Sequence, residues 1–108
     1  MAKQRFKLKQ LTGQDAVTSN TKYKVINSVQ DFEDGYTSLF VKTLDPDYYM
    51  LFNSIRLIIT EHGSSLSHLA IVGREYNIPI FLVENIISKI PKKGILSIKN
   101  NMLEVETK

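Results

Sequence analysis

Neither cysteine nor tryptophan occurs among the 108 residues of the chain. Without cysteine there is no disulfide framework and no thiolate metal site. No apolar run approaches the roughly 18–20 residues that a membrane-spanning helix needs, and the N-terminus lacks the apolar core of a secretory signal. We therefore expect one soluble, cytoplasmic domain over residues 1–108, with no membrane contact and a modest core to which five Phe and five Tyr contribute.

The motifs of a complete enzyme are missing as well. The chain has no phosphate loop of the G-x-x-x-x-G-K-S/T kind and no nucleophile elbow around a serine. It has no room for a separate nucleotide-binding domain or a barrel. Its acids do not cluster as a Mg²⁺ site requires, and the six-residue spacing of His62 and His68 is not a familiar metal spacing. The chain alone is not a complete enzyme, and we predict no metal ligands.

Positive charge is concentrated at the N-terminus. The net charge is +3, and the first ten residues hold Lys3, Arg5, Lys7 and Lys9 without an acid. A nucleic-acid-binding arm would interleave aromatic side chains, of which this segment has only Phe6. Lysines also discourage association at the edge of a sheet. We expect a solvated edge strand and no nucleic-acid partner.

Apolar and alternating runs predict most of the regular structure. The motif Asp45-Pro46-Asp47 starts a helix, because an aspartate can cap it and proline suits its first position. A short amphipathic helix is expected over residues 84–90, and residues 10–21 are polar, with Thr12, Gly13, Gln14 and Asp15 turn-like. The pair Asn100-Asn101 joins a C-terminal hairpin. Strands are expected over residues 4–10, 23–26, 39–44, 57–60, 80–83, 95–99 and 102–106.

The stretch from residue 56 to residue 83 carries the chemistry. The strand over 57–60 is followed by a small-residue loop, a helix over 67–76 and the next strand, and Asn77 and Pro79 end the helix. His68 lies where the loop turns into the helix. The first helical turn presents unpaired N–H groups and the positive end of the macrodipole, which favour a phosphate. A histidine there can meet an anion or carry one covalently; the alternative is a histidine that only caps and packs.

This stretch resembles the phosphohistidine signature of the phosphoenolpyruvate (PEP)-utilising enzymes, roughly T-x-x-G-G-x-x-S-H-x-A-x-x-A-R-x-x-x-I-P. The family includes pyruvate phosphate dikinase, phosphoenolpyruvate synthase, enzyme I of the sugar phosphotransferase system and rifampicin phosphotransferase. Ser64 and Gly73 depart from the pattern, and Leu66 replaces the regulatory threonine of plant-type dikinases. The resemblance covers about residues 22–106, is specific over 60–79 and is weak over 1–21. The positions in register are Thr60, Gly63, Ser67, His68, Ala70, Arg74, Ile78 and Pro79.

The resemblance implies an α/β fold, a three-layer β/β/α swivelling phosphohistidine domain. It implies that His68 carries a phosphoryl group between a nucleotide (ATP) site and a site for pyruvate, PEP or another acceptor. Those sites, with Mg²⁺ and ATP or PEP, are expected on partner domains, one of them ATP-grasp-like, and no cofactor is expected in this domain. The phosphoryl group needs local partners for its charge. The candidates are Thr60, Gly63, Ser64, Ser65, Ser67 and Arg74.

Each candidate also has a purely structural interpretation. Thr60 is also suited to end a strand, and Ser67 to cap the helix. Arg74 lies six residues beyond the histidine and is equally suited to pair with Glu75 or an acid across the sheet. His62 is best interpreted as a solvated loop residue. For the whole chain, the alternatives to a carrier domain of a larger enzyme are a stand-alone phosphocarrier protein and a non-catalytic swivelling or binding module.

Overall fold

A computed structural model describes residues 2–12 and 18–107. Strands make up most of the regular secondary structure. One α-helix, α1 (His68–Glu75), and three short 3₁₀ helices, η1 (Val29–Asp31), η2 (Pro46–Leu51) and η3 (Ile87–Lys89), connect them. The strands are β1 (Ala2–Lys7), β2 (Lys9–Thr12), β3 (Thr18–Val25), β4 (Ser38–Val41), β5 (Leu57–Thr60), β6 (Ile80–Leu82), β7 (Lys93–Lys99) and β8 (Met102–Thr107).

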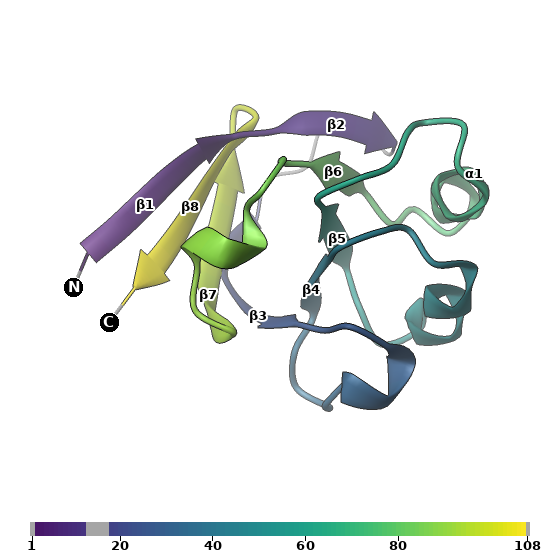
Figure 1. The fold of residues 1–108 in the computed structure, drawn as a ribbon, viewed down its shortest axis with the longest axis horizontal. Coiled ribbons are helices and arrows are strands. Elements are labelled where there is room, and N and C mark those ends of the chain that lie inside the picture. Colours follow the sequence, from purple (N-terminus) through teal and green to yellow (C-terminus); the bar gives the residue numbers. More distant parts are fainter. Residues whose placement is uncertain (1, 13–17, 108) are drawn as a thin grey trace.

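All eight strands form one mixed sheet in the order β1-β8-β7-β3-β4-β5-β6-β2. Its two edge strands are consecutive in the chain, so the sheet curls until it is nearly closed (Figure 1). The predicted single strand over 4–10 is therefore two strands that meet at Leu8. The side chain of Leu8 is buried, and its N–H donates to the carbonyl of Asn101 at 2.8 Å. This bend takes the chain from one edge of the sheet to the other.

The parallel part of the sheet is β3-β4-β5-β6, and every residue of β4 and β5 is buried. Burial on both faces explains why these strands are continuous apolar runs. Helices α1, η1 and η2 lie on one side of β4 and β5, and β1, β8 and β7 lie on the other (Figure 1). A separate hydrophobic core fills each side, with Ile58, Leu69 and Ile80 on the helical side and Phe40, Ile59 and Phe81 on the strand side.

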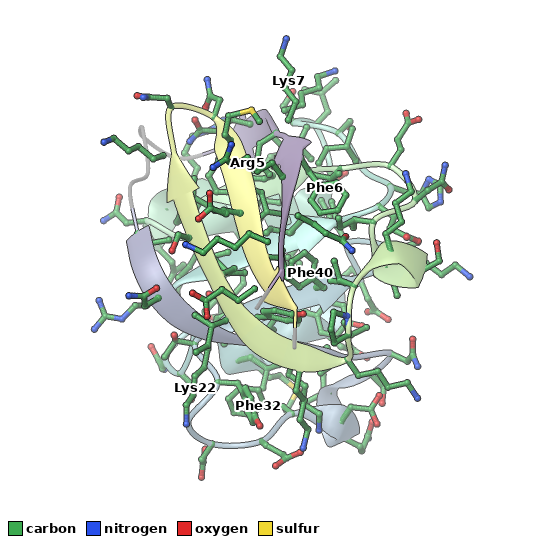
Figure 2. All side chains as sticks on the ribbon, turned by 90° about the vertical axis from the view of Figure 1, so that its left-hand side faces the viewer. Arg5, Phe6, Lys7, Lys22, Phe32 and Phe40 are labelled. Atoms are coloured by element: carbon green, nitrogen blue, oxygen red, sulfur yellow. The ribbon has the colours of Figure 1, made fainter. Side chains whose placement is uncertain are left out.

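Lys3, Arg5 and Lys7 of β1 are exposed, and Figure 2 shows Arg5 beside β8 and Lys7 at the top of the view. β1 is an edge strand of the sheet, as predicted from its lysines. Glu104 on β8 accepts from both Lys3 and Arg5, at 3.3 and 3.0 Å. These contacts are solvent-exposed ion pairs, which contribute little to stability.

Four sequence-based expectations are only partly right. The α/β class is only partly right, because the single α-helix has eight residues and the sheet is one continuous, mostly antiparallel surface instead of two separate layers. The strand predicted over 23–26 begins earlier, because β3 starts at Thr18 and pairs with β7; the turn-like residues 13–15 lie outside the described structure, and Thr12 ends β2. The helix over 84–90 is only η3, and the helix after Asp45 is the 3₁₀ helix η2. None of the described helices is long and apolar enough to cross a membrane.

The local capping and turn signals are confirmed. The carboxylate of Asp45 accepts from the N–H of Asp47 at 2.9 Å and caps η2. Asn77 takes the left-handed conformation, with φ 58°, one residue after Tyr76, the C-cap of α1. Asn100 and Asn101 have φ 55° and 60° and join β7 to β8 as an antiparallel hairpin. Asparagine tolerates the left-handed backbone region better than most other residues with a side chain, so these turns are predictable from the sequence.

Candidate functional site

The loop from β5 to α1 is anchored from beneath by Thr60. This side chain is fully buried, and its hydroxyl donates to the carbonyl of His62 at 2.7 Å, with a longer contact of 3.4 Å to the carbonyl of Lys42. The N–H of His62 donates in turn to the carbonyl of Lys42 at 3.1 Å. In this geometry Thr60 fixes the loop backbone and does not face solvent.

Glu61 is a second anchor, and sequence reasoning missed it. Its side chain is buried, and its carboxylate accepts from the backbone N–H of Ile87 at 2.9 Å. This bond ties the loop after β5 to the start of η3. The sequence did contain a signal, because Glu61 directly follows the predicted buried strand over 57–60. A carboxylate at such a position needs a hydrogen-bond donor in place of water.

Gly63 gives the loop a shape that no other residue adopts easily. Its φ is 148°, and a Cβ at this position would lie 2.7 Å from Cδ1 of Leu44. Both the backbone conformation and the close approach therefore require glycine. The signature glycine is explained by loop geometry, and its N–H remains a candidate donor to a phosphate.

Ser64 to Ser67 form a tight turn that leads into α1. The Ser67 hydroxyl oxygen accepts from the N–H of Ser64 at 3.0 Å, and the Ser64 hydroxyl oxygen accepts from the N–H of Leu66 at 3.2 Å. Ser67 occupies the N-cap position of α1, but its side chain makes no capping bond to the helix. Ser65 is exposed at the tip of the turn. The serines thus hold the turn together and leave the first helical turn uncapped.

His68 is the first residue of α1, and its side chain is exposed. No side chain or backbone group of the described residues hydrogen-bonds to its imidazole. The first intrahelical bond runs from the N–H of Ile71 to the carbonyl of Ser67, at 3.0 Å. The N–H groups of His68, Leu69 and Ala70 precede it and have no acceptor within residues 2–12 and 18–107. The imidazole and three free donors therefore share one helix end.

Arg74 is not brought to this helix end. It is exposed in the last turn of α1, roughly 9 Å along the axis from His68 and about 240° around it. It forms no ion pair with any acid that the structure describes, Glu75 included. Gly73 packs α1 against the sheet, since a Cβ there would lie 3.0 Å from Cδ1 of Ile80. The predicted Arg74–phosphate contact stays a prediction, and on this helix alone the geometry does not favour it.

His62 is exposed in the loop, and its ring has no hydrogen-bond partner in the described part of the chain. Within that part, no group of three or more His, Asp or Glu side chains is arranged to hold a metal ion. A surface hollow of about 450 Å³ lies away from α1. Its walls come from β3, β7, β8 and the segments beside them, namely Lys22, Tyr36, Pro91, Lys93, Gly94, Ile95 and Glu106.

Comparison with known protein families shows to which family the chain belongs. Residues 37–99 match the family described as PEP-utilising enzyme, mobile domain. The chain belongs to this family. The match contains the whole β5–loop–α1–β6 unit, and PEP-utilising mobile domains are phosphotransfer carrier domains of multidomain enzymes. The resemblance drawn from the signature is therefore confirmed, and partner domains are implied.

Two curated proteins are similar to this mobile domain. A probable phosphoenolpyruvate synthase from Staphylothermus marinus is 36% identical over 66 residues, which cover 61% of the chain and 8% of the synthase. Rifampicin phosphotransferase from Bacillus subtilis is 40% identical over 65 residues, which cover 59% of the chain and 7% of that enzyme. The matched part is less than a tenth of either relative, so most of each relative lies outside the comparison.

Proposed function

We propose that this mobile domain carries a phosphoryl group on His68 between a donor site and an acceptor site on partner domains. The observation that supports this role best is the exposed imidazole at the open end of α1, with no competing hydrogen bond among the described residues. An unprotonated ring nitrogen attacks phosphorus, a P–N bond forms, and the bond from phosphorus to the leaving oxygen breaks. Delivery reverses these events at the acceptor.

The chain offers neutral donors for the charge of the phosphorylated ring. The N–H groups of residues 68–70 are free within the described structure, and the hydroxyl of Ser65 is exposed beside them. Phosphoryl transfer depends mostly on positioning and charge neutralisation, so a carrier can leave the strong cations to its partners. Mg²⁺ and ATP or PEP are assigned to the partner domains, one of them ATP-grasp-like.

The names of the relatives suggest the reaction class. One is called a probable phosphoenolpyruvate synthase and the other a rifampicin phosphotransferase. By analogy, ATP or PEP donates the phosphoryl group, and the acceptor is pyruvate, phosphate, water or a small molecule. In the finer fold assignment, the parallel part and the antiparallel part of the single curled sheet correspond to the two β layers of a swivelling β/β/α domain, and α1 with η2 forms the third layer. The parent enzyme is proposed to be cytoplasmic.

The test is phosphorylation of His68. The chain is incubated with ATP or PEP and with the phosphotransferase polypeptide encoded beside it. If the chain is part of a longer protein, that full-length protein is incubated with ATP or PEP instead. We expect an acid-labile, alkali-stable mass gain of one phosphoryl group. His68→Ala abolishes this gain and His62→Ala, a matched loop histidine, keeps it. A partner that phosphorylates a positive control but not this chain would favour a non-catalytic module instead.

A further inference from the structure

Large apolar side chains are exposed on one part of the surface. Among the described residues six are exposed, and five of these lie in the loop before α1, on α1 and its end, or on η2. They are Tyr49 (48% exposed), Met50 (73%), Leu66 (83%), Ile71 (43%) and Tyr76 (44%), and the sixth is Met102 on β8. We call these five residues the His68 face.

His68 belongs to this surface by position. Ile71 follows it by three residues on α1, so the two side chains neighbour each other on the same side of the helix. Leu66 precedes it by two residues in the turn. The exposed aliphatic side chains Leu66 and Ile71 therefore flank His68 in the chain, at positions where a solvated loop and helix start would accept serines or charged residues equally well.

The aromatic half of the face is continuous with this helix. The hydroxyls of Tyr49 and Tyr76 are 2.7 Å apart, and their rings meet edge to face with centroids 5.4 Å apart. Phe52 lies buried against both rings, at 5.7 Å from each. The contact joins η2 to the end of α1 and holds both tyrosines in fixed, amphipathic positions. Such tyrosines are characteristic of interfaces, because they add contact area at little entropic cost.

A partner must cover this region if His68 is to react. In-line transfer requires the ring to enter a site from which water is excluded, so the surface around the ring is buried each time. The matched segment is only 8% and 7% of its two relatives, which leaves most of their length for the domains that hold such sites. Exposed apolar residues beside the ring fit a surface that is covered intermittently.

We propose that the His68 face is the docking surface for the partner domain that loads His68 with phosphate. This inference rests on the carrier function proposed above and adds the contact residues. The interface is small and transient, because a carrier has to leave its partner in every cycle. Docking lowers the apparent Michaelis constant for the carrier, while the ring's own reactivity is independent of the face.

The experiment compares Ile71→Glu with Met102→Glu. The two side chains are similarly exposed, 43% and 40%, but Met102 lies on β8, a strand that is not next to α1 (Figure 1). Met50→Glu, at a 73% exposed position of η2, tests the face at a distance from the ring. For each variant we measure the rate of partner-catalysed phosphorylation at low carrier concentration, with the same partner protein as above.

Phosphoramidate, which transfers its phosphoryl group to imidazole with release of ammonia, measures ring reactivity without a partner. We expect Ile71→Glu to slow partner-catalysed loading about tenfold and Met50→Glu severalfold. Met102→Glu is expected to load at the rate of the unmodified chain, and all three to react equally with phosphoramidate. Equal loading of all three variants would overturn the docking inference and leave the carrier function standing. No loading of the unmodified chain would overturn both.

Discussion

Replacing Thr60 by Val separates two roles that the signature threonine can have. Thr60 was predicted from the sequence to contact phosphate or to end a strand. In the structure its buried hydroxyl donates to the carbonyl of His62 at 2.7 Å, and it also accepts a long contact of 3.3 Å from the N–H of that residue. Val has the same shape but no hydroxyl. The substitution therefore removes the loop anchor and keeps the packing of β5.

The expected loss follows from one good hydrogen bond. A typical intramolecular hydrogen bond contributes about 0.5–1.5 kcal/mol, and leaving a buried acceptor unpaired costs about 1–3 kcal/mol. The extra methyl of Val offsets part of this loss by about 0.8 kcal/mol. We expect the free energy of unfolding to fall by about 1–2 kcal/mol. With a urea slope of about 2 kcal/mol/M, in the middle of the range for small proteins, the midpoint moves down by roughly 0.5–1 M.

Urea unfolding of the unphosphorylated chain measures this loss, and Thr43→Val is the matched control because Thr43 is exposed in the loop after β4. Thr60→Ser, which keeps the hydroxyl, should restore the rate of His68 phosphorylation by phosphoramidate if Thr60→Val lowers it through a displaced loop. The reasoning would be refuted if Thr60→Val left the urea midpoint unchanged while phosphorylation slowed tenfold. That result would indicate a direct phosphate contact instead.

Two further predictions concern the other end of the sheet. Gly94→Ala places a Cβ 2.8 Å from Cε2 and 2.9 Å from the hydroxyl oxygen of Tyr23, so overpacking should lower the free energy of unfolding by about 1–3 kcal/mol in urea titrations; an unchanged midpoint would contradict this. Burial raises the pKa of Tyr23 to about 12, above its ordinary value near 10. The stability that the neutral phenol contributes is therefore complete below pH 10 and is lost as the pH rises toward 12. Comparing Tyr23→Phe with the unmodified chain between pH 9 and 12 checks this, because the variant should show a shallower decline.

Local chemistry explains why much of the fold was predictable. The continuous apolar runs that became β4 and β5 are buried on both faces. Asp45 caps η2, and Asn77 ends α1 through a left-handed residue. Each of these features is decided by a few neighbouring residues, because the relevant side chain and backbone groups are in the same turn.

The closure of the sheet was not predictable in the same way. β1 pairs with β8, almost the full length of the chain away, and β2 pairs with β6. Nothing within residues 2–12 indicates that a bend at Leu8 sends the two halves to opposite edges. β3 starts at Thr18, before the strand predicted from Tyr23, because its polar first residues pair with β7. Strand pairing of this kind depends on distant partners, which override local propensity.

The sequence pattern placed His68 at the start of a helix. It did not show which of the surrounding residues shape the loop and which are free to contact a ligand. Thr60 and Glu61 are buried and bond to backbone groups, and the conformation of Gly63 forces the turn. A pattern of letters does not distinguish a residue that contacts a ligand from one that shapes the loop, because both are equally constrained. Burial is what separates them, and burial depends on elements such as η3 that lie elsewhere in the chain.

The site has two parts, an anchored base beneath the loop and a solvent-exposed tip that carries His68. The base consists of β5 and its anchored loop, where buried polar groups are paired with backbone. At the tip, His68 and the N–H groups of the first turn of α1 are left unpaired within the described structure. A carrier gains from this division, because an imidazole held by its own protein would have to break those bonds in each cycle before it met phosphorus. Because the anchored loop holds the backbone at His68 in one position, the entropic cost of placing the ring is met when the domain folds. That cost does not recur at each phosphoryl transfer.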